Sequence, residues 1–127
     1  MSQSIILFAH GARDPEWARP FERLRAALLA VRADVRVELA YLELMQPDLA
    51  GAVDELATGG ATAINVVPVF MAQGGHLKRD LPRLVVEVQS RYPAIRISLQ
   101  PAVGEAQAVI DAMATHIAEQ TQTGEPG

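Results

Sequence analysis

The sequence contains no cysteine, so it can form neither a disulfide framework nor a thiolate metal site. Any bound metal ion must use imidazole, carboxylate or backbone oxygen, which leaves three histidines and the acidic residues as side-chain ligands. The chain also lacks an apolar run near the roughly 20 residues that a membrane span requires, and its first four residues carry no basic signal region. We therefore expect a soluble, cytoplasmic protein with no membrane partner.

Runs of basic residues are missing as well. The formal net charge is −4, which argues against a nucleic-acid partner held mainly by phosphate contacts. Half of the 127 residues are apolar, which suits one globular domain with a single core. We assign this domain to residues 1–120. Residues 121–127 are polar without a periodic apolar face, so we expect them to form a flexible C-terminal tail.

Short β-rich runs alternate with amphipathic helical stretches, which is typical of βαβ units and a parallel sheet. We expect four strands, at residues 5–9, 35–42, 64–70 and 95–99. The first and third are apolar almost throughout and are predicted to be central, whereas the second and fourth alternate with polar residues and are predicted edges. Right-handed crossovers then favour the order 2-1-3-4 with helices on both faces, a three-layer α/β sandwich.

The helices are predicted from caps and apolar spacing. The first is expected to start at Asp14 and Pro15 and to run to about Arg32. The second is expected to open at Pro47 and to end at residues 59–60, where two glycines suit a left-handed C-cap. The apolar stripe that we expect to pack the first helix on the sheet is Trp17, Phe21, Leu24, Leu28 and Val31.

Strand order reverses between the first and third strands, and open α/β sheets bind ligands beyond the carboxyl ends of their strands at such a point. His10 follows the first strand and His76 follows the third, so the two imidazoles are expected over one pocket. Glu43 follows the second strand and adds a carboxylate, either as a ligand or as a proton acceptor. Neutral imidazole binds cobalt, iron, nickel and zinc, and it is also a general base near neutral pH. His116 lies on the last helix, beside an apolar stripe, and we assign it no role in the site.

Other residues near this edge are weaker candidates. Gly11, Gly74 and Gly75 could adopt positive φ angles or let a flat ligand approach the backbone. Arg13, Lys78 and Arg79 would suit a substrate that carries carboxylates, although solvated surface charge explains them nearly as well. Four apolar residues could line a cleft, or serve in the core or a dimer interface: Leu44, Met45, Phe70 and Met71.

Three segments carry a resemblance to a known family. They are residues 6–15 (ILFAHGARDP), Tyr41-Leu42-Glu43 with Pro47, and residues 68–82 (PVFMAQGGHLKRDLP). The combination resembles the short-form sirohydrochlorin cobaltochelatases, class II tetrapyrrole chelatases related to the sirohydrochlorin ferrochelatases, over about residues 3–119. The larger members carry two such α/β units in one polypeptide, so the resemblance implies a half-size unit that pairs as a homodimer with its cleft between subunits.

The resemblance also implies a reaction. His10 and His76 match the family's metal-binding and catalytic histidines, and Glu43 matches its acidic partner. The enzyme, a lyase that forms nitrogen–metal bonds, would insert Co²⁺ into sirohydrochlorin for cobalamin synthesis, and Fe²⁺ would instead lead to siroheme. Nickel is a further alternative. The metal would be a substrate, and no tightly bound cofactor is expected.

Two rival functions use the same residues. A metal-binding module or metallochaperone would share His10, Glu43 and His76 without needing an apolar cleft wide enough for a macrocycle. Phosphoryl transfer through a nucleophilic histidine is suggested by the His-Gly pair after the first strand, but Ala9 stands where an arginine is expected.

Overall fold

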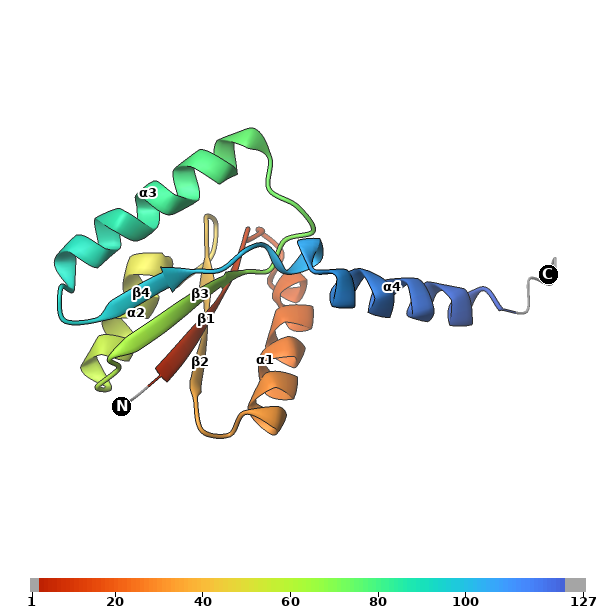
Figure 1. Cartoon of the computed structure of the whole chain (residues 1–127), viewed down its shortest axis with the longest axis horizontal. Coiled ribbons are helices and arrows are strands. Elements are labelled where there is room, and N and C mark those ends of the chain that lie inside the picture. Colours follow the sequence, from red (N-terminus) through yellow and green to blue (C-terminus); the bar gives the residue numbers. More distant parts are fainter. Residues whose placement is uncertain (1–2, 123–127) are drawn as a thin grey trace.

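The computed structural model describes residues 3–122 of the chain, so residues 123–127 of the predicted tail lie outside it. Four strands and four α-helices alternate along the sequence (Figure 1). The strands are β1 (Gln3–Ala9), β2 (Arg36–Tyr41), β3 (Ala63–Pro68) and β4 (Arg96–Leu99). The helices are α1 (Arg19–Val31), α2 (Leu49–Thr58), α3 (Gly75–Arg91) and α4 (Gln107–Gln120), with short 3-10 helices η1 (Pro15–Ala18) and η2 (Val103–Glu105).

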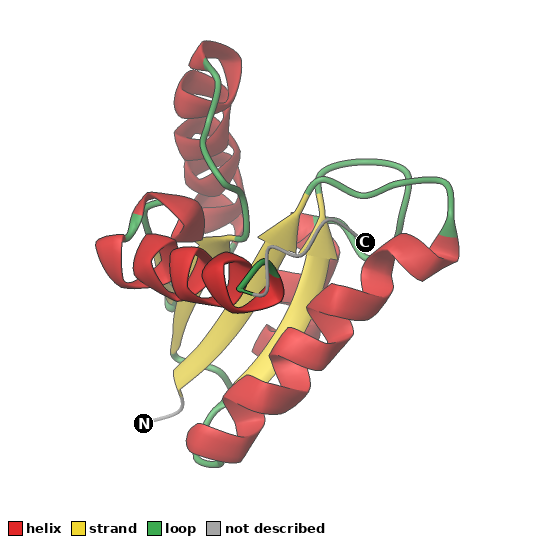
Figure 2. Cartoon of the chain, turned by 90° about the vertical axis from the view of Figure 1, so that its right-hand side faces the viewer, coloured by secondary structure: helices red, strands yellow, loops and turns green. Residues whose placement is uncertain are grey.

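The sheet is parallel throughout and has the order β2-β1-β3-β4, which confirms the predicted order. β1 pairs with β2 on one side and β3 on the other, so the switch point lies between β1 and β3. Helices pack on both faces, as the view from the side of α4 shows (Figure 2). The three-layer α/β prediction is therefore confirmed.

The two faces of the sheet are not equally covered. The main core lies on the face of α2 and α3, where inward residues of the strands are buried, including Ile6, Phe8, Ile64 and Val66. On the opposite face α1 covers β2 and β1 through smaller clusters. The side chains of β3 that point to that face, among them Asn65 and Val67, remain half-buried. The sheet is thus more completely covered on the face of α2 and α3 than on the face of α1.

The first helix differs from its prediction in where the α-helix begins and in which residues face the sheet. Asp14 caps it as expected, its carboxylate accepting from the Glu16 backbone N–H at 2.9 Å, but the first turn is the 3-10 helix η1. The α-helix begins only at Arg19, with Pro20 in its first turn. The predicted apolar stripe was partly wrong, because Leu24 is 39% and Val31 77% exposed. Leu29 packs towards the sheet beside Leu28 instead, and Phe21 packs beside Trp17.

The second helix begins after Pro47, not at it. Asp48 is the N-cap, and its carboxylate accepts from the Gly51 backbone N–H at 2.8 Å. At the other end Gly60 has a φ of +92°, so the expected left-handed C-terminal glycine is confirmed one residue beyond the cap position.

The last helix, α4, leaves the body beyond the carboxyl end of β4 and has no other element beside it (Figure 1). Its neighbour is η2, which connects it to the sheet. None of the helices in residues 3–122 combines the length and apolar character needed to cross a bilayer.

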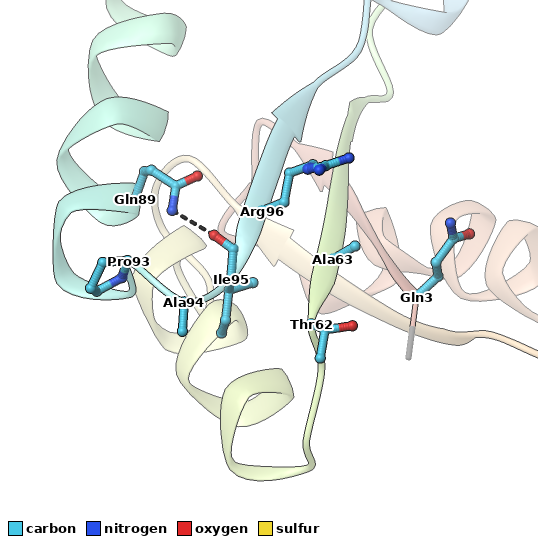
Figure 3. A pocket seen from close by; sticks show the side chains of 8 residues that line it. All are labelled: Gln3, Thr62, Ala63, Gln89, Pro93, Ala94, Ile95 and Arg96. Atoms are coloured by element: carbon cyan, nitrogen blue, oxygen red, sulfur yellow. Dashed lines mark hydrogen bonds between the residues drawn. The ribbon is translucent and has the colours of Figure 1, made fainter. Parts of the chain in front are cut away.

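The side chain of Gln89 on α3 bonds the backbone at the start of β4 (Figure 3). Its amide nitrogen donates to the carbonyls of Ile95 at 2.6 Å and Tyr92 at 3.0 Å, and its carbonyl accepts from the Ile97 backbone N–H at 2.9 Å. Because β4 is an edge strand, this N–H would otherwise lie unpaired on the free edge. Gln89 therefore anchors α3 to β4 and covers that edge.

We expect Gln89→Ala to lower the free energy of unfolding by about 1–3 kcal/mol, because it removes three hydrogen bonds to partly buried backbone groups. Urea denaturation followed by circular dichroism measures the effect. Ser90→Ala is the matched control, since its hydroxyl bonds only the Glu87 carbonyl of its own helix. Equal stability of the two variants would contradict the anchoring role of Gln89.

Candidate functional site

His10 stands at the carboxyl edge of the sheet, directly after β1. Its ring stacks on Phe70, with centroids 4.3 Å apart and planes at 30°. Phe70 follows β3, is only 5% exposed and contacts Phe8 in the core, so it forms a firm support. His10 itself is exposed, and within residues 3–122 neither ring nitrogen has a hydrogen-bond partner. The imidazole is therefore oriented by stacking while both nitrogens can bind a metal ion or a proton.

Glu43 lies beside His10 because β1 and β2 continue their pairing past the strand ends. The Leu42 N–H donates to the Ala9 carbonyl at 2.9 Å, and the Glu43 N–H donates to the His10 carbonyl at 3.0 Å. The Glu43 side chain is exposed and forms no ion pair within the described residues. Two of the predicted site residues are thus brought together by the sheet itself.

Gly11 allows this close approach of the two loops. Its φ is +92°, and a Cβ built there would lie 1.8 Å from the carbonyl oxygen of Glu43. The expectation of a positive φ is confirmed for Gly11. Gly74 and Gly75 have no positive φ, and a Cβ at either position would meet nothing within 4 Å, so the alternative expectation for them, approach of a flat ligand to the backbone, stays a prediction. Open space at these two glycines leaves room for a ligand at the start of α3.

His76 occupies the first turn of α3, which projects past the carboxyl edge of the sheet (Figure 1). Gly74 caps this helix without a side-chain hydrogen bond, so the first N–H groups are free to bind an anion. Lys78 and Arg79 follow on the same end, exposed and without an ion pair within residues 3–122, and Arg13 is exposed in the β1 loop. The start of α3 therefore combines the positive end of the helix dipole with two cationic side chains, followed by acidic Asp80.

A hollow of about 340 Å³ lies between the end of β2 and α3. Its apolar lining is Leu42, Leu77, Leu81 and Leu84, and neither His10, Glu43 nor His76 lines it. Its rim is charged: Asp80, Arg83 and Glu87. This volume is at the lower end of the range for small-molecule sites. Of the four predicted apolar candidates, Leu44 (58% exposed) and Met71 (65%) lie at the surface, Met45 is half-buried beside Tyr41, and Phe70 is buried.

No three histidine or acidic side chains within residues 3–122 lie close enough to hold one metal ion. The backbones of His10 and Glu43 are hydrogen-bonded to each other, whereas His76 lies on α3. The three residues do not form a single metal-binding group within residues 3–122. Sequence reasoning missed the stacking of Phe70 on His10. A phenylalanine after a buried strand gives no signal beyond core packing, so only the fold could find it.

Residues 4–120 match the family model described as CbiX. The chain belongs to the CbiX family. Among curated proteins, it is 33% identical over 117 residues to the sirohydrochlorin ferrochelatase of Bacillus subtilis, covering 89% of this chain and 43% of that protein. It is 34% identical over 82 residues to the sirohydrochlorin cobaltochelatase of Methanopyrus kandleri, covering 65% of this chain and 57% of that one. This CbiX chain thus spans about half the length of these curated relatives.

Solved structures agree with this assignment. The CbiX protein of Marinobacter aquaeolei VT8, described as a cobalamin biosynthesis protein, superposes with a TM-score of 0.84 at 28% identity, covering 95% of this chain and 98% of that one. SirB from Bacillus subtilis with Fe³⁺ gives a TM-score of 0.79 at 29% identity, covering 94% of this chain and 47% of that one. SirB in complex with cobalt gives 0.80 at 28% identity, covering 94% and 51%.

Proposed function

We propose that this CbiX protein is a lyase that inserts a divalent metal ion into sirohydrochlorin. The observation that carries the proposal is His10, held by Phe70 with both ring nitrogens free, beside Glu43 at the switch point of a CbiX fold. The names of its relatives, sirohydrochlorin ferrochelatase and cobaltochelatase, support the substrate. Cobalt is our first choice of metal substrate, which would place the protein in cobalamin synthesis. Iron, which would lead to siroheme, and nickel are the alternatives.

The reaction is balanced by two protons: sirohydrochlorin and Co²⁺ give cobalt-sirohydrochlorin and two H⁺. Two pyrrole N–H protons must leave as a partly dehydrated metal ion enters, so the protein has to position the ion opposite a proton acceptor. One of His10 and His76 delivers the metal ion, and the other, or Glu43, accepts protons. Imidazole suits either role, because it binds divalent metals and exchanges protons near neutral pH.

The remaining candidates would hold the ring. Arg13, Lys78 and Arg79, together with the free N–H groups at the start of α3, would bind the carboxylates of sirohydrochlorin. Gly74 and Gly75 leave space beside the backbone for a flat macrocycle. The hollow of about 340 Å³ is small for a tetrapyrrole, and a cleft completed by a second subunit supplies the missing wall. The proposed assembly is therefore a homodimer. The proposed location is the cytoplasm.

The deciding experiment mixes purified, metal-free protein with sirohydrochlorin and Co²⁺, Fe²⁺ or Ni²⁺ in turn. Insertion is followed by the change in absorbance of the macrocycle. We expect the rate to exceed that of the protein-free reaction with at least one metal. Absence of acceleration with all three, together with metal binding in equilibrium dialysis, would replace the chelatase by a metal-binding module.

A further inference from the structure

Asp80 on α3 is an exposed carboxylate that no contact within the described part of the chain explains. It forms no hydrogen bond and no ion pair there. The sequence offers a comparison, because the pattern His-x-x-Arg-Asp occurs twice, at residues 10–14 and 76–80. Asp14, the equivalent of Asp80, caps η1 by accepting from the Glu16 backbone N–H. Asp80 has no such structural role, so its carboxylate is available to a ligand.

The histidine of the second pattern, His76, lies four residues before Asp80 on the same helix. By helix geometry the two side chains lie about 40° apart around the axis of α3 and about 6 Å apart along it. Residues at this spacing are neighbours on one side of a helix, and two histidines so spaced can hold one zinc ion. The His76 ring is exposed and has no hydrogen-bond partner within residues 3–122. Residues 10–14 are not helical, so only the second pattern brings its histidine and aspartate together in this way.

This pair lies on the side of α3 that faces the end of β2. Asp80 borders the hollow between the two elements, and the opposite wall includes Leu42, the residue before Glu43. His76 falls in the same sector of the helix, between the directions of Asp80 and Arg83 and one turn closer to the helix start. That end of α3 projects past the carboxyl edge of the sheet (Figure 1). An ion held by the pair would therefore lie on the β2 side of α3.

The charges around His76 explain why it would need a carboxylate to bind a cation. Lys78 and Arg79 lie in the first turns of α3, and the helix start carries the positive end of the dipole, so a lone imidazole there is a weak cation site. Asp80 is the one acidic residue among residues 75–81. Its charge offsets these cations, and the same cations keep the binding weak enough for the ion to be released.

We propose that His76 and Asp80 form a loading site, which binds a divalent transition-metal ion on α3 before the ion passes to the tetrapyrrole. The inference deepens the proposed function and rests on it for the fate of the ion. The His76 imidazole and an Asp80 carboxylate oxygen coordinate the ion, and water fills the remaining positions, which leaves the ion open to exchange. Transfer replaces these ligands by ring nitrogens without any change in the oxidation state of the metal.

Calorimetric titration of metal-free protein with Co²⁺, in the absence of tetrapyrrole, tests the loading site. The background is His10→Ala combined with His116→Ala, which leaves His76 as the only histidine of a chain without cysteine. We expect this background to bind Co²⁺, and we expect Asp80→Asn to raise its dissociation constant at least about tenfold. Glu55→Gln, which removes an exposed carboxylate from α2, is the matched control and should leave the constant unchanged.

A second substitution separates coordination from charge. Asp80→His removes the negative charge but keeps a metal ligand at the same helical spacing, so its affinity for Co²⁺ should equal or exceed that of the background. Affinity as weak as that of Asp80→Asn would show that only the charge matters and would overturn the loading site. Equal affinity of Asp80→Asn and Glu55→Gln would overturn it as well.

Steady-state kinetics of metal insertion provide an independent measurement in the chain that retains His10. We expect Asp80→Asn to raise the KM for Co²⁺ at least about tenfold and to leave kcat unchanged, because excess Co²⁺ compensates for the lost ligand. A lower kcat at an unchanged KM would contradict a loading role. The titrations need no tetrapyrrole, so absence of binding at the pair would leave the chelatase proposal to its own assay, and failure of insertion would leave a measured metal site on α3.

Discussion

Replacement of His10 or of His76 by alanine is expected to lower the rate of metal insertion by about 10²–10⁴-fold, the usual contribution of a positioned acid–base group. His10 has both ring nitrogens free and a ring fixed on Phe70, so alanine removes the reactive group while leaving the core side of Phe70 in place. His76 is exposed in the first turn of α3, where its loss does not disturb the core. The measurement is kcat/KM for Co²⁺ and sirohydrochlorin.

His116→Ala is the matched histidine control. His116 lies on α4 in line with Ala108 and Ala112, so alanine there extends the existing apolar line of the helix. We expect its kcat/KM to stay within about twofold of the parent, a change of under about 0.5 kcal/mol in the activation free energy. Activity of His10→Ala and His76→Ala at the level of His116→Ala, with the folds confirmed by circular dichroism, would remove both residues from the mechanism.

Gly11→Ala is expected to lower the free energy of unfolding by at least about 2 kcal/mol. Two causes act together: the φ of +92° is unfavourable for alanine, and the new Cβ would collide with the Glu43 carbonyl. Urea denaturation measures the loss. Relief of the collision would separate the loops that hold His10 and Glu43, so metal insertion by the folded fraction should fall as well.

Gly75→Ala provides the comparison for Gly11→Ala. Gly75 opens α3 without a positive φ, and no atom lies within 4 Å of its built Cβ. Alanine there should leave stability unchanged or raise it by up to about 1 kcal/mol. A Gly11→Ala variant as stable as Gly75→Ala would show that the turn at Gly11 tolerates a side chain after all.

The strand order could be predicted because burial leaves a direct trace in the sequence. A strand covered on both sides shows continuous apolar residues, as in residues 5–9, whereas the edge strand β2 alternates with Arg36 and Glu38. The handedness of crossovers then leaves few arrangements of four strands. The same reasoning predicted that His10 and Glu43 lie close together, because residues that follow adjacent parallel strands meet at one edge of the sheet.

Other features could not be predicted, because a periodic pattern says which side chains share a face but not what they contact. Leu24 and Val31 fit the stripe of the first helix, yet α1 covers only part of the sheet and both are exposed. The last helix also carries an apolar stripe, and that stripe gave no sign that the tight contact of Gly104 with Met71 directs the helix away from the sheet. Both outcomes depend on contacts between distant segments.

Phe70 takes part in three contacts: its ring packs against Phe8, supports His10, and its carbonyl accepts from Gly104. A smaller residue at this position would weaken the interior and tilt the imidazole in the same step. Rigidity and reactivity at this edge therefore depend on the same aromatic ring, and neither can be adjusted there without altering the other.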